Sequence, residues 1–146
     1  MKKQILLLAF IGILFSCNKN NADSNLKTGL IGNWKLTEMT GNIANAKPAK
    51  ASEMPWQETY QFNDNNTFQK TRDRDGITTK VSGTYKMTKD SNLISLELSF
   101  DKESEIIGSC SSKTEEYLSF QSEKLILSND SWSACDGPGL KYEKTN

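Results

Sequence analysis

The chain has 146 residues, of which 18 are Lys or Arg and 18 are Asp or Glu, so its formal net charge at pH 7 is zero. Without a surplus of basic residues, the composition offers no patch of the kind that binds nucleic acid. The sequence contains no histidine, which excludes nucleophiles activated by a Ser-His or Cys-His pair.

The N-terminal segment has the pattern of a secretory signal. Lys2 and Lys3 precede an unbroken apolar run over residues 5–15. A membrane-spanning helix needs about 20 apolar residues, so this run is too short for a stable span. We therefore expect residues 1–16 to be removed as a signal peptide. A buried N-terminal helix is the alternative, but the polar residues that follow give it nothing to pack against.

Residues 14–17, LFSC, resemble the lipobox of bacterial lipoproteins. The resemblance implies that Cys17 is lipidated, with palmitate-type acyl chains, and becomes the new N-terminus. The next residues are polar and lack apolar periodicity, so we expect residues 17–29 to be a lipidated tether. Acyl chains contribute about 0.8 kcal/mol per buried CH₂, which predicts attachment to a membrane of the cell envelope. Asn18 stands where an inner-membrane retention signal usually carries Asp, and this favours the outer membrane.

Two cysteines remain once Cys17 is lipidated. Cys110 and Cys135 would lie in an oxidising compartment, where disulfides persist. A zinc site is the alternative, but two cysteines without histidine cannot supply the usual four ligands. We therefore predict a Cys110–Cys135 disulfide and no metal site.

Beyond the tether, apolar and polar residues alternate, which is typical of half-buried β-strands. Short turn sequences such as Asp75-Gly76 separate the alternating runs. The candidate strands are residues 32–40, 56–63, 66–74, 77–87, 92–100, 113–120, 123–129 and 139–145. Eight strands joined by tight turns predict an antiparallel meander, and closure into a barrel removes its two exposed edges. We therefore expect residues 30–146 to form an all-β, eight-stranded antiparallel up-and-down barrel.

The cysteines also bear on the register of the late strands. If residues 120 and 123 face each other across a turn, Cys110 and Cys135 lie nearly opposite each other at the far end of that hairpin. On this register, the strand assignment and the predicted disulfide support each other.

Residues 32–34, GNW, are similar to the Gly-x-Trp signature of lipocalins, in which the tryptophan plugs the closed end of the barrel. From Leu30 to Lys144 the chain resembles the lipocalin-like domains of bacterial lipoproteins. The resemblance is carried by four motifs in order: LIGNWKL at 30–36, FNDNNTF at 62–68, GTY at 83–85, and a late cysteine, Cys135, before KYEK at 141–144.

This resemblance implies that Gly32 and Trp34 close one end of the barrel. One feature departs from the family pattern. Lipocalins usually carry a late arginine that packs over the signature tryptophan, whereas the last strand here offers only Lys141 and Lys144.

The alternation of side chains predicts charged groups inside the barrel. If Phe68 points inward, the residues two, four and six positions later do so as well, and inward positions on the neighbouring strand continue the set. These inward residues are Lys70, Arg72, Arg74, Glu58 and Trp56. Charged groups in a dry core cost several kcal/mol unless they are paired. We therefore expect an open, partly polar cup that is wet or occupied by a ligand.

In this interpretation Lys70 and Arg72 meet the acidic head of a small amphipathic ligand, and Trp56 contacts its apolar body. Trp132, near the second cysteine, either covers the barrel mouth or anchors a partner. The candidate ligand-binding residues are Trp56, Glu58, Lys70, Arg72 and Trp132. Alternatively, a bulge shifts the alternation, or the charged side chains reach solvent at the rim.

No arrangement of residues suggests catalysis or a cofactor. The adjacent carboxylates Glu115 and Glu116 point to opposite faces of a strand. The preferred hypothesis is a lipid-anchored module that binds a small amphipathic molecule without catalysis. The alternative is an inhibitor or interaction lipoprotein whose rim loops grip another envelope protein. A cavity of about 300 Å³ or more would favour a ligand, whereas a filled barrel would favour the rim.

Overall fold

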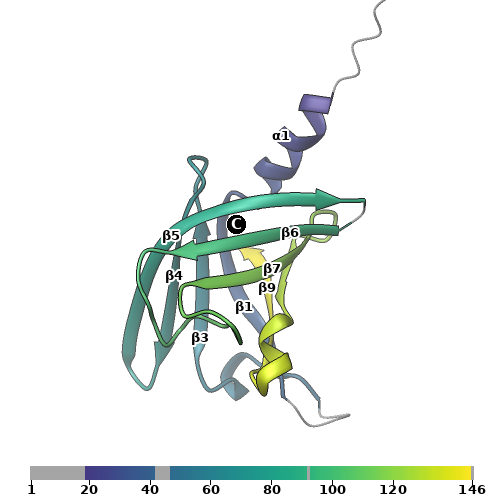
Figure 1. The fold of residues 1–146 in the computed structure, drawn as a ribbon. Coiled ribbons are helices and arrows are strands. Elements are labelled where there is room, and N and C mark those ends of the chain that lie inside the picture. The colour runs from purple at the N-terminus through teal and green to yellow at the C-terminus, as the bar shows by residue number, and fades with distance from the viewer. Residues whose placement is uncertain (1–18, 42–46, 92, 146) are drawn as a thin grey trace, which may run out of the picture.

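The computed structural model describes residues 19–41, 47–91 and 93–145. The strands form one antiparallel sheet in which each strand pairs with its neighbour, and β1 also pairs with β9, so the sheet closes into a barrel (Figure 1). The elements in chain order are α1 (Lys19–Leu30), β1 (Gly32–Thr40), β2 (Ala49–Lys50), the 3₁₀ helix η1 (Ala51–Glu53), β3 (Gln57–Phe62), β4 (Thr67–Arg74), β5 (Ile77–Asp90), β6 (Leu93–Phe100), β7 (Glu115–Gln121), β8 (Ile126–Asn129), the 3₁₀ helix η2 (Ser131–Cys135) and β9 (Gly139–Thr145).

The predicted all-β, eight-stranded antiparallel barrel is confirmed. The additional strand, β2, has only two residues and was not predicted. It pairs with Glu38 and Met39 near the end of β1, beyond the residues that pair with β3. The predicted signal peptide, residues 1–16, and the predicted lipidation site, Cys17, lie outside the described residues. Within the described part of the chain, no helix is long and apolar enough to span a membrane.

The turn between β7 and β8 differs from the expected register. Phe120 pairs with Leu127, not with residue 123, because residues 122–125 form the turn and Leu125 adopts a positive φ of 50°. The predicted disulfide is nevertheless present. Cys110 lies in the loop between β6 and β7, Cys135 lies in η2, and their Cα atoms are 5.6 Å apart. The bond therefore joins the β6–β7 loop to η2 and is not part of the β-ladder.

Aromatic side chains fill much of the barrel interior. Tyr60 stacks on Phe62 with ring centroids 5.6 Å apart and meets Tyr142 edge-on at 5.0 Å. Phe68 meets Phe100 edge-on at 4.9 Å. Burial alternates along β3 and β4, as expected when one face of each strand points into the barrel.

The Gly-x-Trp motif lies at the end of the barrel where β1 begins. Gly32 has φ of 122°, and a Cβ there would come within 3.2 Å of Lys144 Cε, so the position requires glycine. Trp34 is fully buried, and its Nε1 donates to the carbonyl of Leu30 at 2.8 Å. Lys144 Nζ lies 6.0 Å from the Trp34 ring centroid and donates to the carbonyl of Gly29 at 2.7 Å. A lysine thus lies where the family pattern suggested an arginine.

The segment that we expected to be a polar tether is helical from Lys19 onward. Leu30 is fully buried and Leu26 packs against the core. Their spacing of four residues places both on one face of the helix, a stripe too short to stand out in such a polar segment. The C-terminal part of α1 is therefore fixed to the closed end of the barrel.

Candidate functional site

Four ionised side chains lie together inside the barrel, and we call them the interior ion cluster: Glu58, Lys70, Arg72 and Glu116. Lys70 Nζ lies 3.0 Å from Glu58 Oε1 and 2.8 Å from Glu116 Oε2. Arg72 Nε donates to Glu58 Oε2 at 2.6 Å. All four residues are buried. Two cations and two carboxylates balance each other, which limits the cost of placing charge in the interior.

Neutral side chains complete this cluster. Tyr60 Oη donates to Glu116 Oε1 at 2.8 Å, and Asn129 Nδ2 donates to the same oxygen at 2.7 Å. Tyr142 Oη donates to Glu58 Oε1. Burial, followed by the nearby carboxylates, raises the pKa of both Tyr60 and Tyr142 well above 10. Both hydroxyls therefore remain protonated donors at neutral pH.

The strand register explains how the cluster assembles. Glu58 pairs with Arg72 and Tyr60 pairs with Lys70 across β3 and β4, so alternation alone brings these residues to the inner face. Glu116 reaches the cluster from β7. Sequence reasoning missed it because alternation shows that only one of two adjacent glutamates points inward, without showing which. The inward position of Tyr60 follows from the same alternation, but its hydrogen bond to the cluster was missed, as were those of Asn129 and Tyr142.

The surroundings of Lys70 differ from the open cup that we expected. Glu58 and Glu116 lie against its ammonium group, and the whole side chain is buried. The inward direction of Lys70 and Arg72 is as predicted. The sequence showed which cations point inward, but it did not reveal that a carboxylate from β7 would pair with Lys70. A ligand-binding role for Glu58 and Lys70 stays a prediction.

Arg72 links the interior ion cluster to the open end of the barrel, which we call the mouth. Its Cζ lies 4.5 Å from the ring centroid of Trp56 and 5.7 Å from that of Trp132. Its Nη2 donates to the carbonyl of Ile106 at 3.2 Å. A guanidinium between aromatic faces is held by cation–π attraction. All five candidate ligand-binding residues therefore belong to one connected group.

The mouth contains a hollow of about 290 Å³. Arg74, which follows Arg72 on the inward side of β4, has its Cζ 5.5 Å from the Trp56 ring. Nε1 of Trp56 is buried and has no hydrogen-bond partner among the described residues. The residues that line the hollow are Arg72, Arg74, Asp75, Ile77, Thr79, Glu105 and Ile106. The lining thus combines two guanidinium groups, two carboxylates and two isoleucines, so its formal charges balance.

The disulfide region fixes Trp132 beside this mouth. The Cys110–Cys135 bond ties η2 to the loop between β6 and β7, and the Trp132 backbone N–H donates to Asn129 Oδ1 at 3.2 Å. Gly137 packs directly on the indole, since a Cβ there would come within 2.4 Å of the ring. Trp132 is therefore held from several sides.

A closed antiparallel barrel with a hollow at its mouth is the architecture of a ligand-binding fold. Residues 30–127, well over half of the chain, match the family model of the lipocalin-like domain. The chain therefore belongs to the family of lipocalin-like domains, as its motifs predicted. Searches among curated proteins and among solved structures found no match. The family is in general a non-enzymatic binding fold, and its fold suggests small hydrophobic ligands.

Proposed function

We propose that this protein is a lipid-anchored lipoprotein of the cell envelope, at the outer membrane, that binds a small amphipathic anion without catalysis. The observation that carries the proposal is the hollow at the mouth, which has a volume of about 290 Å³. Its guanidinium groups suit an acidic head, and Ile77 and Ile106 suit an apolar body. The volume lies just below the about 300 Å³ at which ligand sites usually begin, so only a small ligand fits.

The charges at the mouth point to Arg74 as the main contact for an anion. Arg72 already donates through Nε to Glu58. The Arg74 side chain is 58% exposed, and its nearest carboxylate, on the exposed Asp75, is 3.6 Å away. Ion pairs between exposed side chains are weak, so a ligand carboxylate competes well for Arg74. An acceptor that reaches Trp56 would also satisfy its buried Nε1.

Membrane attachment is supported by the lipobox-like sequence that ends at Cys17. The intact mass of protein purified from its own envelope tests this part of the proposal. Cleavage before Cys17 with added acyl chains is the expected result, and Cys17→Ala abolishes both. An unmodified Cys17 would contradict it.

A second candidate function uses the same end of the barrel. Ile77, at the tip of the β4–β5 hairpin, is 68% exposed, and exposed apolar side chains at a rim favour contact with another protein. In this case an envelope protein, not a small molecule, covers the mouth.

A fluorescence titration separates these candidates. Trp56 and Trp132 flank the mouth, whereas Trp34 lies at the opposite end of the barrel and contributes a constant signal. Decanoate and decanol serve as matched probes because they differ in the acidic head. We expect decanoate to bind more tightly than decanol, because the alcohol lacks a charge for Arg74.

Two charge-removing variants complete the design. We expect Arg74→Gln to weaken decanoate binding about tenfold, equivalent to about 1.4 kcal/mol, through loss of a charge-assisted hydrogen bond. Lys80→Gln removes an exposed charge from β5 and leaves the affinity unchanged. Equal affinity for the two probes, or for Arg74→Gln and the parent protein, would contradict the proposed mode of binding.

A further inference from the structure

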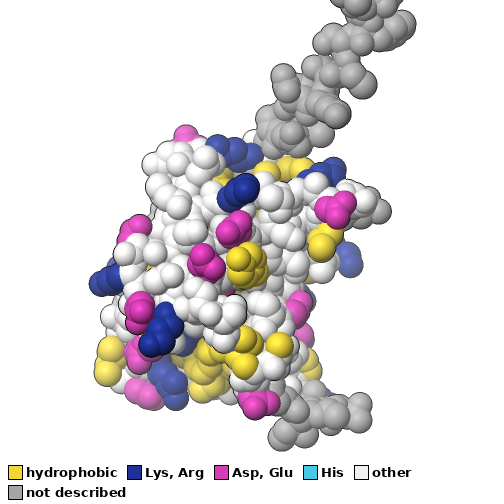
Figure 2. All heavy atoms as spheres, viewed as in Figure 1, with side chains coloured by type: hydrophobic (Ala, Val, Ile, Leu, Met, Phe, Trp, Pro, Cys, Tyr) yellow, Lys and Arg dark blue, Asp and Glu magenta, His cyan; other side chains and the backbone are white. Residues whose placement is uncertain are grey.

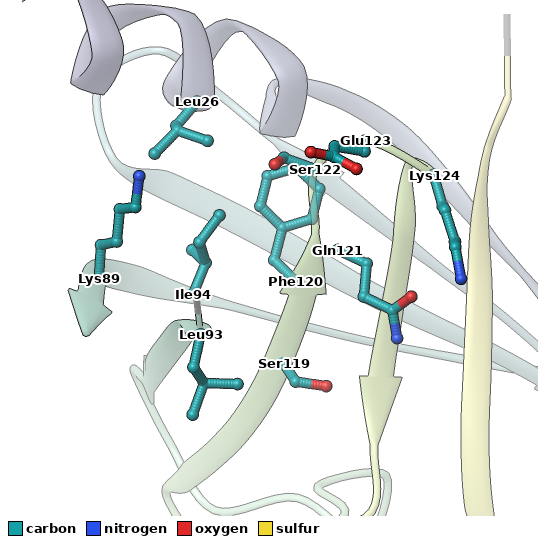
Figure 3. A pocket seen from close by; sticks show the side chains of 10 residues that line it. All are labelled: Leu26, Lys89, Leu93, Ile94, Ser119, Phe120, Gln121, Ser122, Glu123 and Lys124. Atoms are coloured by element: carbon teal, nitrogen blue, oxygen red, sulfur yellow. The ribbon is translucent and has the colours of Figure 1, made fainter. Parts of the chain in front are cut away.

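The closed end of the barrel carries a second and larger hollow, of about 520 Å³ (Figure 3). Leu26 comes from α1, Leu93 and Ile94 from the start of β6, and Phe120 from β7. The other lining residues belong to the end of β5, to β7 and to the β7–β8 turn: Lys89, Ser119, Gln121, Ser122, Glu123 and Lys124. Apolar groups thus form part of the hollow, and polar groups surround them.

Exposed leucines extend this surface beyond the hollow. Leu93 is 59% exposed and Leu125 is 39% exposed. Leu125 lies on the same end as α1, since its side chain comes within 3.9 Å of the position a Cβ would take on Gly29. Leucines this exposed gain little from the fold itself, and a group of them marks a contact surface.

Basic side chains surround the leucines. Lys89 and Lys124 line the hollow and are exposed, and Lys27 lies in the last turn of α1. The acidic neighbours are Glu123 and Asp90, so these charges sum to a small positive surplus. Figure 2 shows hydrophobic and basic side chains next to one another at this end. Leucine flanked by lysine is the composition of surfaces that rest at the boundary of anionic lipid headgroups.

The position of α1 relates this surface to the membrane. The helix begins at Lys19, two residues after Cys17, and its 12 residues extend about 18 Å, pointing away from the barrel (Figure 1). Contact of the closed-end face with lipid therefore requires α1 to lie along the membrane surface. Its C-terminal turn is fixed to the barrel by the Lys144–Gly29 and Trp34–Leu30 hydrogen bonds. The closed end is thus the end of the barrel nearest the proposed anchor.

We infer that the closed-end face, formed by Leu26, Leu93, Leu125, Lys89 and Lys124, rests on an anionic lipid surface, so that the mouth points away from the membrane. The inference rests on the proposed membrane attachment. In this orientation the exposed Leu93 and Leu125 lie at the headgroup boundary, and Lys89 and Lys124 contact anionic headgroups. The ligand-binding mouth then remains open to the aqueous compartment.

Fluorescence quenching in vesicles tests this orientation. The full chain is reconstituted into vesicles of phosphatidylcholine and phosphatidylglycerol that contain a lipid-borne quencher at headgroup depth. A thiol-reactive dye is placed at Leu93→Cys, at Leu125→Cys, or at Ile77→Cys, the matched exposed apolar position at the mouth. The parent chain, treated with the same dye, gives the background from any Cys17 thiol that carries no lipid.

We expect quenching at positions 93 and 125 and none at position 77. The quenching should be lost in phosphatidylcholine alone at high salt, and lost when Lys89→Glu and Lys124→Glu are added to the labelled chain. Equal quenching at the three positions, quenching at 77 alone, or none at all would overturn the inference. The last result includes the case in which a protein partner covers this face.

Failure of the proposed function gives a different result. If the mass shows no acyl group but the expected quenching pattern is present, the proposed lipidation is contradicted and the proposed orientation stands. A lipidated chain that binds decanoate but lacks the pattern overturns the orientation alone.

Discussion

Lys70 is the residue on which the charge balance of the interior depends. Its ammonium group lies within 3.0 Å of one glutamate and 2.8 Å of another, and the residue is fully buried. Removing it leaves two carboxylates close together without a shared cation, and breaking a buried pair in this way typically costs 3–5 kcal/mol. Lys70 therefore contributes to the fold whether or not a ligand binds above it.

We expect Lys70→Met to lower the free energy of unfolding by about 3–5 kcal/mol, measured by urea denaturation. Lys86→Met, at an exposed position of β5, is the matched control and should change stability by no more than about 0.5 kcal/mol. A Lys70→Met protein as stable as this control would show that the interior ion cluster is not required for the fold.

Tyr60 and Tyr142 make stability depend on alkaline pH. Their pKa values in the folded protein are well above 10, whereas unfolded tyrosine titrates near 10. Below pH 10 both states hold the proton, so this contribution to stability is fully present. Above pH 10 the unfolded chain loses protons first, so the free energy of unfolding falls until the folded tyrosines also titrate.

The slope approaches about 1.4 kcal/mol per pH unit for each buried tyrosine once the unfolded state is fully deprotonated, and it averages about 1 kcal/mol per unit between pH 10 and 11. Tyr60→Phe and Tyr142→Phe should each reduce the slope by about this amount, in urea denaturation measured between about pH 10 and 11. Tyr117→Phe changes a ring that is 44% exposed and should reduce it less. Identical slopes in all four proteins would be incompatible with buried, protonated hydroxyls.

At the scale of the elements, the β5–β6 pair contains a position where only glycine fits. A Cβ on Gly83 would lie 2.0 Å from the carbonyl oxygen of Ser99 and 2.8 Å from Phe100 Cα. Both are backbone atoms held in the ladder, so the strands would have to move apart. This close approach of the two backbones explains why the GTY motif begins with glycine.

We expect Gly83→Ala to destabilise the protein by about 1–3 kcal/mol, the usual cost of overpacking. The control is Gly41→Ala, where none of the residues that the structure describes lies within 4 Å of an added Cβ, and the change should be within about 0.5 kcal/mol. Thermal or urea denaturation measures both. If the two variants were equally stable, the strands would not be as close at Gly83 as the structure shows.

The elements differ in how well the sequence predicts them. Strands such as β3 and β4 alternate over six or more residues, and their positions could be predicted closely. The two-residue β2 leaves no pattern, α1 is mostly polar, and the β7–β8 register depends on a four-residue turn that favours no particular pairing. Long periodic segments were therefore predictable, and short or polar segments were not.

At the scale of the molecule, the disulfide joins the β6–β7 loop to η2 beside the mouth. It connects residues separated by 25 positions, and closing a loop of this length restricts the unfolded chain. The chain-entropy relation assigns about 3 kcal/mol to such a bond. The same bond fixes η2, which carries Trp132.

We expect the Cys110→Ser, Cys135→Ser double variant to lose about 3 kcal/mol of unfolding free energy in urea. We also expect a changed tryptophan emission, because Trp132 loses one of its restraints. A loss below about 1 kcal/mol with unchanged emission would mean that the loops are held without the bond.

In the candidate site, strand alternation predicts which side chains point inward but not which side chains they contact. The inward direction of Glu58, Lys70 and Arg72 follows from their positions on β3 and β4. The pairing of Lys70 with Glu116 depends on contact across the barrel, which no local pattern encodes. The sequence thus predicted a charged interior, while the structure shows that this interior is paired and that the accessible hollow lies above it, at Arg74.

Native mass spectrometry of protein gently purified from its own envelope shows whether the mouth holds a small anionic amphiphile. We expect a discrete added mass at high occupancy that is lost on denaturation, strongly reduced in Arg74→Gln and retained in Lys80→Gln. A bare protein mass, an adduct unaffected by Arg74→Gln, or a co-purifying protein in place of a small molecule would contradict this expectation.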